Sequence, residues 1–333
     1  MSDAYSQVID RLSRAKRVLI TTHVKPDGDA LGSTAAMALG LKHKGIDSQI
    51  VLLSHLPRKY AFVYTDNGIE HIDVEQAWPA TLRLDDFDCF LVCDTGTWSQ
   101  LPGLQERIAI WNVPKLVIDH HLTQESWADV KLVDTKAGAC GEIVEELLAK
   151  WGVPMDHKIA AALFVAIVTD TGWFQYSNTR PQTLRLAAEL MEVGVDTDRI
   201  QNLLYRNERA ERVALQARGM QKLELINDGR VAIIVLRKED FADTRSSVND
   251  TEDLINIPLQ IRTVEVAALM TESPDGGPIR VSMRSKGKVD VAKFAEQFGG
   301  GGHARASGMK FATSLDAAHQ KVVDSLMKLK FDR

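Results

Sequence analysis

The stretch VIDHH, residues 117–121, ends an apolar run with an aspartate and two adjacent histidines. A buried strand does not need these polar side chains in order to fold, so they indicate chemistry at the end of a strand. The residues around them, PKLVID (114–119), have the continuous apolar pattern of a strand buried on both faces. Similar runs predict further strands: RVLITT (17–22), SQIVLL (48–53), FDCFLVCD (87–94) and KLVD (131–134).

Helical patterns separate and follow these strands. We expect helices in the amphipathic N-terminal stretch and at residues 30–45, 140–152, 158–172 and 181–196. Alternating strands and helices are typical of a parallel sheet with crossover helices. In such a sheet, functional residues gather at the edge formed by the carboxyl ends of the strands.

A second pattern begins near residue 196. Residues 196–225 are highly charged and helical in pattern, and we interpret them as a connector. They precede predicted strands at 230–236, 264–272, 278–286 and 309–312, and predicted helices at 251–261, 289–298 and 314–329. A chain of 333 residues is also longer than one core usually organises. The predicted fold class is therefore α/β, with a parallel-sheet domain at 1–195, a helical linker at 196–226 and a smaller α/β domain at 227–333.

The composition, 45% hydrophobic and 26% charged, is that of an ordinary globular protein. A net charge of −5 argues against a long duplex as the main ligand, although residues 262–310 carry eight Lys and Arg against five Asp and Glu. The longest apolar run, residues 159–168, is too short to span a bilayer, and the N-terminal residues lack the apolar core of a signal peptide. Three cysteines without a CxxC pair predict no disulfide framework and a cytoplasmic location.

The stretch HVKPDGDALGS, residues 23–33, places His23, Asp27 and Asp29 directly after the first predicted strand. Carboxylates this close repel each other unless a cation lies between them, and mixed imidazole and carboxylate ligands suit a transition metal or zinc better than calcium. By itself, the segment is equally consistent with an Asp-Gly turn and a helix N-cap. Further ionisable residues follow other elements: Asp94, Asp119, His120, His121 and Asp170. Together these residues fit two metal ions, an arrangement suited to in-line displacement at phosphorus.

These motifs resemble the DHH family of phosphoesterases, which has HxxPDGDALGS, a strand-end aspartate, Asp-His-His and TDTG in this order. The segment GGGGHARASG (299–308) resembles the glycine-rich signature of the DHHA1 domain. The pairing is most similar to the bacterial branch of nano-RNases and pAp phosphatases, relatives of the RecJ nuclease core. The resemblance covers residues 10–320, and it implies a hydrolase of ester bonds, both phosphodiesterase or exoribonuclease and phosphomonoesterase.

The resemblance also implies a role for each residue. One metal would be held by His23, Asp27 and Asp94. The second would be held by Asp29, Asp94, His120 and Asp170, so that Asp94 would bridge the two ions. Asp119 would orient a neighbouring histidine, and His121 would face the scissile phosphate as a catalytic contact. The expected cofactors are two divalent ions, manganese first, with magnesium or cobalt as alternatives.

The glycine segment is the predicted substrate site. Four glycines expose backbone N–H groups and let a phosphate or base approach closely, whereas a plain surface loop is the alternative. The expected binding residues are Arg284, Gly300, Gly301, Gly302 and His303, with Arg262, Lys286 and Arg305 as weaker candidates. This layout predicts that the two domains together limit the length of the substrate. The N-terminal domain would hydrolyse the phosphoester, and the C-terminal domain would bind the far end of a short nucleotide.

The expected function is hydrolysis of oligonucleotides of about two to five nucleotides, and of 3′-phosphoadenosine 5′-phosphate (pAp). One alternative is a signalling phosphodiesterase for cyclic or linear dinucleotides, and another is a RecJ-like exonuclease, which would need an extended basic or aromatic track. A nucleotide-binding regulator without catalysis is a third alternative, against which the complete ligand set counts. The expected partners are short RNA or DNA and pAp, with no membrane and no long duplex, and a homodimer stays open.

Overall fold

Within residues 2–331, which the structure describes, six strands of the first unit form one parallel sheet. The structure is a computed structural model, and its first unit is Met1–Asn207. The strand order is β3-β2-β1-β4-β5-β6, and every neighbouring pair is parallel. The strands are β1 (Arg17–Thr21), β2 (Asp47–Leu52), β3 (His71–Asp73), β4 (Cys89–Cys93), β5 (Lys115–Asp119) and β6 (Val130–Val133).

The strand order of this sheet reverses at β1, which lies between β2 and β4. The chain adds β2 and β3 on one side of β1, and then returns to add β4, β5 and β6 on the other. In open α/β sheets, ligands bind outside the carboxyl ends of the strands at such a switch point. His23 follows β1 and Asp94 follows β4, so these two predicted site residues lie at the switch point between β1 and β4.

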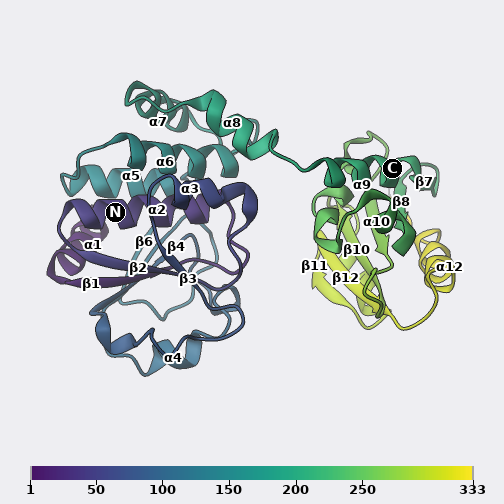
Figure 1. The fold of residues 1–333 in the computed structure, drawn as a ribbon, viewed down its shortest axis with the longest axis horizontal. Helices are drawn as coiled ribbons and strands as arrows, with labels where there is room; N and C mark the ends of the chain where they lie inside the picture. Colours follow the sequence, from purple (N-terminus) through teal and green to yellow (C-terminus); the bar gives the residue numbers. More distant parts are fainter. Residues whose placement is uncertain (1, 332–333) are drawn as a thin grey trace. The chain divides into compact units, whose positions relative to one another are not determined.

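Helices cover both faces of the first sheet (Figure 1). One face packs against α1, α2, α5 and α6, and the other packs against α4 and the loops around it. The helices of this unit are α1 (Ser2–Arg14), α2 (Gly28–His43), α3 (Ala61–Thr65), α4 (Gln105–Ala109), α5 (Cys140–Lys150), α6 (His157–Asp170), α7 (Pro181–Glu192) and α8 (Thr197–Tyr205). The strands are therefore buried on both sides, as their continuous apolar runs predict.

Helices α2 and α6 approach each other closely because small residues line their contact. A Cβ atom added to Gly32 would lie 2.4 Å from the carbonyl oxygen of Ala162, so only glycine fits there. Asp29 lies in the first turn of α2, and Asp170 is the last residue of α6. The packing of the two helices thus brings two of the predicted site carboxylates to the same edge of the sheet.

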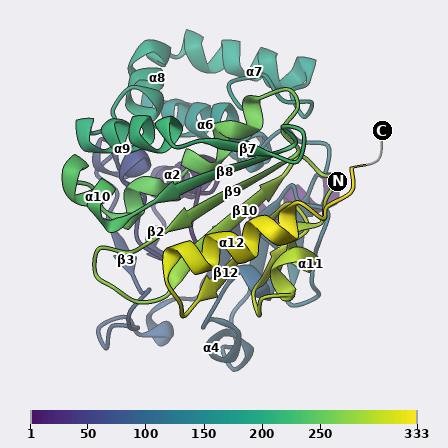
Figure 2. The same ribbon diagram turned by 90° about the vertical axis from the view of Figure 1, so that its right-hand side faces the viewer.

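The second unit, Glu208–Arg333, is built on a mixed six-stranded sheet of order β11-β12-β10-β9-β8-β7. Its strands are β7 (Glu224–Ile226), β8 (Val231–Leu236), β9 (Val266–Thr271), β10 (Ile279–Ser285), β11 (Gly301–His303) and β12 (Ala306–Phe311). One face packs against α11 (Val291–Glu296) and α12 (Leu315–Leu326), and Figure 2 shows α12 lying across β10 and β12. The other face packs against α9 (Ala210–Gln221) and α10 (Lys238–Thr244), but only over part of its width.

Several predicted elements differ from the structure. Residues 196–225, expected to be helical throughout, form α8, an irregular stretch at 206–209, α9 and the start of β7. Residues 251–261, expected to form a helix, form short 3-10 turns, because Asp253 has a left-handed φ of 64° and Pro258 lacks an N–H group. The short strand β3 and the short helices α3, α4 and α10 were not predicted.

The sequence predicted no strand within residues 299–308. Gly301–His303 form edge strand β11, and β12 begins at Ala306 rather than at residue 309. The three cysteines are buried and free, as expected. No helix among residues 2–331 combines the length and the apolar character that crossing a bilayer requires.

Candidate metal centre

The carboxyl ends of three strands bring most of the predicted site residues together. His23 follows β1, Asp94 follows β4, and Asp119 is the last residue of β5, with His120 and His121 directly after it. The starting turn of α2 and the end of α6 add the others, which are Asp27, Asp29 and Asp170. Potential ligand atoms of these side chains fall into overlapping groups in which they lie within 4.8 Å of one another.

The first group consists of His23, Asp27 and Asp94. The Nε2 atom of His23 lies 3.4 Å from a carboxylate oxygen of Asp94 and 3.9 Å from one of Asp27. The Nδ1 atom of the same ring is 3.0 Å from the carbonyl oxygen of Val24, to which it donates when it carries the proton. This bond leaves Nε2 as the free nitrogen facing the carboxylates, which is the usual arrangement of a metal-binding histidine.

Asp27 also caps helix α2. Its Oδ1 atom accepts hydrogen bonds from the backbone N–H groups of Asp29 and Ala30. The sequence left two roles open for this segment, an N-cap and a metal ligand. The two roles are compatible, because the cap hydrogen bonds use Oδ1 of Asp27 and leave Oδ2 to bind a metal.

The second group consists of Asp29, His120 and Asp170. The Nε2 atom of His120 lies 3.4 Å from Asp94, 3.6 Å from Asp170 and 3.8 Å from Asp29. Its Nδ1 atom is 3.2 Å from the carbonyl oxygen of Ala137, a bond that again leaves Nε2 toward the carboxylates. His120 and His23 thus approach Asp94 in the same way, through different carboxylate oxygens.

Asp94 links the two groups: it belongs to the first and forms a further group with His120 and His121, so that His120 connects it to the second. It is buried, and its backbone has a left-handed φ of 65°, a conformation that costs most residues free energy and that aspartate tolerates better than most. Its N–H group donates to the carbonyl oxygen of Ile118 at 2.8 Å, which ties the end of β4 to β5. A strained aspartate at this point is held in place by the sheet on which it ends.

Asp29 is held rigidly as well. Its oxygens accept hydrogen bonds from the Ser33 hydroxyl at 3.0 Å and from the N–H groups of Cys140 at 2.6 Å and Gly141 at 3.0 Å. Those two N–H groups belong to the first turn of α5, where the helix dipole favours a negative charge. The start of α5 therefore orients this carboxylate toward the centre.

Asp119 is fully buried and holds His121 rather than His120. One of its oxygens, Oδ1, is 2.8 Å from Nδ1 of His121 and also accepts from the backbone N–H groups of His120 and His121. The other oxygen accepts from the side chain of Gln124. Since Nδ1 of His121 faces Asp119, its Nε2 atom is left free, and the half-exposed ring is accessible to a substrate.

The negative charge of the centre changes the protonation of its histidines. Burial lowers the pKa of His23, but the hydrogen bond and charge of Asp94 outweigh it and raise the pKa to about 9. The pKa of His120 rises to about 10, because Asp94, Asp29 and Asp170 outweigh its burial. Burial raises the pKa of Asp170 to about 6. The clustered carboxylates therefore attract positive charge strongly.

Two buried atoms of the centre support a fit to divalent metal. The Oδ1 atom of Asp94 and the Nε2 atom of His120 are buried without a hydrogen-bond partner. Buried polar atoms are nearly always paired, so two such atoms facing each other suit binding to a shared cation. Oxygen and imidazole nitrogen are donors that manganese, magnesium, cobalt and zinc accept. The residues present therefore fit a divalent metal centre.

The predicted substrate residues lie in the second unit. Arg284 on β10 is level with Ala306 on β12, and Ala306 is level with His303 on β11, so these side chains share one face of the sheet. Gly300 and Gly301 line a pocket of about 590 Å³ on that face. Arg262 lines a different pocket, with Asn227, Asp228 and Arg230 among its neighbours, and the structure does not bring it to the glycines.

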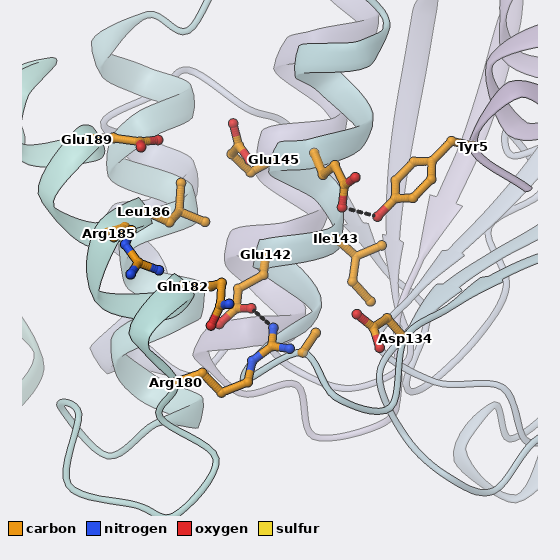
Figure 3. A pocket seen from close by; sticks show the side chains of 12 residues that line it. Tyr5, Asp134, Glu142, Ile143, Glu145, Arg180, Gln182, Arg185, Leu186 and Glu189 are labelled. Atoms are coloured by element: carbon orange, nitrogen blue, oxygen red, sulfur yellow. Dashed lines mark hydrogen bonds and ion pairs between the residues drawn. The ribbon is translucent and has the colours of Figure 1, made fainter. Parts of the chain in front are cut away.

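Supporting residues of the centre were not predicted. Asn178 donates to the carbonyl oxygens of Gly138 at 2.8 Å and Asp170 at 3.1 Å, and its amide is 3.4 Å from the Asp170 carboxylate. The loop that carries Asn178 leads to Arg180, which pairs with the buried Glu142 of α5 at the margin of an acidic pocket of about 430 Å³ (Figure 3). Single polar residues in a loop give no sequence pattern that would have revealed these contacts.

A further group with metal-ligand geometry lies outside the centre. It consists of His55, Asp73 and Glu75, which follow β2 and end β3. Its histidine is 70% exposed, and both ring nitrogens face carboxylates. This group differs from the centre because none of its members is buried.

Comparison with known proteins places this geometry in a family. Residues 17–167 match the model of the DHH family, N-terminal domain, and residues 229–328 match that of the DHHA1 domain. The chain belongs to the DHH family. It is a phosphoesterase of that family with a DHHA1 domain, as the motifs predict.

Relatives of similar length support this assignment. The chain is 28% identical to a bifunctional oligoribonuclease and PAP phosphatase NrnA of Thermus thermophilus, over 93% of this chain and 89% of the relative. It is 26% identical to the protein of the same name from Bacillus subtilis, over 96% of each chain. An exopolyphosphatase-related protein of Bacteroides fragilis has the same fold, with a TM-score of 0.86, 23% identity and coverage of 98% and 96% of the two chains.

Proposed function

We propose that this phosphoesterase hydrolyses short oligonucleotides of about two to five nucleotides to mononucleotides and removes a phosphate from pAp. The observation that carries the proposal is the buried carboxylate of Asp94, which belongs both to the potential ligand group of His23 and Asp27 and to that of His120 and His121. A carboxylate shared between two metal ions about 3.5–4 Å apart is the arrangement that in-line displacement at phosphorus uses. The NrnA relatives support the choice of substrates through their names.

In this proposal, each metal would have its own ligands and Asp94 would serve both. One ion would be held by His23, Asp27 and Asp94. The other would be held by Asp29, Asp94, His120 and Asp170. Manganese is the proposed ion, with magnesium or cobalt as alternatives, because the donors are a mixture of carboxylate and imidazole. When bound, the ions would lower the pKa of a water molecule and neutralise phosphoryl charge.

The other strand-end residues act on the substrate. His121 contacts the scissile phosphate through Nε2 and assists the leaving oxygen, because its ring is exposed and lies beside Asp94. The hydrogen bond to Asp119 raises the pKa of His121, which favours the protonated ring that a general acid needs. Asp119 holds that ring in one orientation, and Gln124 in turn holds Asp119.

The second unit contributes substrate binding. Arg284 and His303 share an open sheet face with the exposed backbone of Gly300, Gly301 and Gly302, a combination that suits an anion. Arg262 is a weaker candidate, since it lines another pocket. Because binding needs only a few phosphates, a protein with a net charge of −5 can act on short nucleic acid.

A length series tests the proposal. The protein with Mn²⁺ is given 5′-labelled RNAs from two to about twenty nucleotides, with pAp and a cyclic dinucleotide in parallel. We expect rapid hydrolysis of pAp and of the two- to five-nucleotide RNAs, and a steep fall with greater length. Length-independent cleavage would favour a RecJ-like exonuclease, and cleavage of the cyclic dinucleotide alone would favour a signalling phosphodiesterase. The absence of hydrolysis on every substrate contradicts the proposal.

The proposed setting is the cytoplasm, because the three free cysteines suit a reducing compartment. Short RNA or DNA and pAp are the proposed substrates, and size-exclusion chromatography with light scattering would distinguish a monomer from a homodimer.

A further inference from the structure

The sheet of the second unit has an open face over three of its strands. Side chains of β9 on this face, such as Leu269, are buried beneath the 3-10 turn at Leu254–Asn256, but Arg280 and Ser282 of β10 are exposed. Gly308 and Lys310 of β12 are exposed on the same side. The pocket of about 590 Å³ lies on this open part. The face therefore presents a floor of sheet backbone that other parts of the unit do not cover.

Two cations stand directly opposite each other at one end of this face. Arg280 on β10 pairs in register with Lys310 on the antiparallel strand β12, and both side chains are exposed. Directly opposed side chains have Cβ atoms about 4.5–5.5 Å apart, and like charges at this distance are destabilising. Neither side chain forms a hydrogen bond or ion pair with any of residues 2–331. An anion between the two would relieve their repulsion.

Small residues form the floor beside this pair. In the next row of the same face, Gly301 is level with Gly308, and Gly308 is level with Ser282. A third row carries His303, Ala306 and Arg284. None of the exposed positions in the three rows is an acidic residue. We call Arg280, Ser282, Gly301, Gly308 and Lys310 the basic platform.

The fold does not require glycine at two of these positions. A Cβ atom added to Gly301 would meet nothing within 4 Å, and one added to Gly308 would meet only a carbonyl oxygen at 3.6 Å, an ordinary contact. Neither residue has a left-handed φ. By contrast, Gly300 could not carry a side chain, because its Cβ would lie 2.3 Å from the Gly308 carbonyl oxygen. Glycine weakens a strand, so its presence at Gly301 and Gly308 points to close approach of a ligand.

We propose that the basic platform binds the phosphodiester backbone of single-stranded substrates beyond the nucleotide that Arg284 and His303 hold. Arg280 and Lys310 contact a phosphate, and Gly301 and Gly308 let the sugar and base lie against the sheet. Arg280 and Arg284 are four residues apart on one strand, so their Cα atoms are about 13 Å apart. A stacked strand rises about 3.4 Å per nucleotide, so this distance corresponds to about four nucleotides. The platform is therefore a subsite for substrates of about four nucleotides or more.

The inference rests on the proposed function for its choice of substrate, and a binding measurement separates the two. Fluorescence anisotropy in EDTA, which prevents metal-dependent turnover, gives the Kd of a labelled five-nucleotide RNA, and competition gives that of pAp. We expect Arg280→Ala with Lys310→Ala to weaken RNA binding at least about tenfold and pAp binding less than about twofold. Losing the contact to one phosphate should also reduce the slope of log K against log salt by about 0.7, the contribution of each neutralised phosphate on single strands.

Two further variants control for charge and for folding. Lys321→Ala removes an exposed cation from α12, which packs on the opposite face of the sheet, and should leave both Kd values unchanged. Gly308→Val fills the floor with a residue that favours strands, so we expect an unchanged or higher melting temperature together with weaker RNA binding. A purely structural role for Gly308 would not produce that combination.

Each outcome bears on one proposal or the other. Wild-type RNA affinity in the double variant, equal losses for RNA and pAp, or no RNA binding by the wild-type protein in EDTA would each overturn the platform. If the wild-type protein hydrolyses pAp and short RNA with Mn²⁺ while the double variant binds RNA normally, only the platform fails. If the double variant loses RNA affinity but the wild-type protein hydrolyses nothing, the platform stands and the proposed function fails.

Discussion

The Oδ1 atom of Asp94 lies 3.4 Å from the Nε2 atom of His120, and both atoms are buried without a hydrogen-bond partner. The other oxygen of the same carboxylate lies 3.4 Å from Nε2 of His23. One carboxylate thus faces two imidazoles whose second nitrogens point to backbone carbonyl oxygens. This relationship makes Asp94 the position at which a single substitution would affect both proposed ions.

We expect Asp94→Asn to reduce hydrolysis of pAp and of short RNA by more than about a hundredfold, beyond the loss typical of an outer-sphere residue. The amide is neutral and offers only one acceptor oxygen, so it cannot be shared between two cations. The fold should persist, since the side chain keeps its size. Turnover rates and bound metal per chain, measured by elemental analysis, check this expectation.

Asp73→Asn is the matched control for that substitution. Asp73 belongs to the other histidine and carboxylate group, with His55 and Glu75, which is not buried. We expect this variant to keep full activity. Unchanged turnover in Asp94→Asn, or an equal loss in Asp73→Asn, would contradict a centre built around Asp94.

Removing metal should destabilise the first unit selectively. A ligand that binds only the folded state adds about 2.7 kcal/mol at a concentration of 100 times its Kd. We expect Mn²⁺ to raise the melting temperature of the first unit in calorimetry, and EDTA to reverse this. The transition of the second unit should not move, and Asp94→Asn should lose most of the shift. A shift of equal size in both units would indicate non-specific binding.

Asn178→Ala should displace Asp170 without removing a ligand. The side chain bridges the carbonyl oxygens of Gly138 and Asp170, so its loss frees the end of α6. We expect activity to fall about 10–100-fold, as for other residues that orient ligands, and to recover partly at higher Mn²⁺ concentration. Asn67→Ala, which breaks a comparable bond to the carbonyl oxygen of Val63, is the control and should leave activity unchanged. A loss that added metal does not reduce would argue against a positioning role.

Asp156 gives a pH-dependent contribution to stability. It caps α6, accepting from the N–H groups of Lys158 and Ile159 at 2.9 Å. Burial raises the pKa of this carboxyl, but the hydrogen bonds from Ile159 and His43 outweigh it and lower the pKa below its usual value. A depressed carboxyl pKa stabilises the folded state above the unfolded pKa of about 3.9, and the stabilisation is lost as the pH falls through the lower folded pKa.

Asp156→Ala should therefore lower the free energy of unfolding by about 1 kcal/mol at pH 7, and by progressively less below pH ~4. Urea unfolding of both proteins at pH 7 and near pH 3 measures the difference. Ser314→Ala removes a neutral cap from α12, so it should lower the free energy of unfolding by the same amount at pH 7 as near pH 3. A constant difference for Asp156→Ala would show that its charge does not contribute.

The sequence predicted the sheet of the first unit because its strands are buried on both faces. Their central residues, VLI (18–20), FLV (90–92) and LVI (116–118), are apolar on both sides of the pleat, and such runs have few other structures open to them. The site followed from the same pattern, since the polar residues stand where the apolar runs end. Strand β3, in contrast, has three residues and two of them are His71 and Asp73, so it carries no apolar signal.

Other features depend on contacts that no local pattern contains. The predicted helix at 251–261 is broken by the left-handed backbone of Asp253, a conformation that glycine or asparagine would have signalled more clearly. The strand at Gly301–His303 consists mainly of glycine, which is rare in strands, and only its pairing with β12 forms it. No sequence pattern marks the polar residues that support the centre, because only the fold brings them beside it. These residues are Asn178, Gln124 and the Glu142–Arg180 pair.

The order of the residues along the chain has a consequence for synthesis. Every residue of the proposed metal centre, from His23 to Asp170, precedes the second unit, which begins at Glu208. At about 5–20 residues per second, a ribosome needs roughly 6–25 s to add that unit. We therefore expect the growing chain to assemble its hydrolytic residues while the residues proposed to hold the substrate are still untranslated. The nascent protein would therefore complete its proposed catalytic residues before its proposed substrate-binding residues.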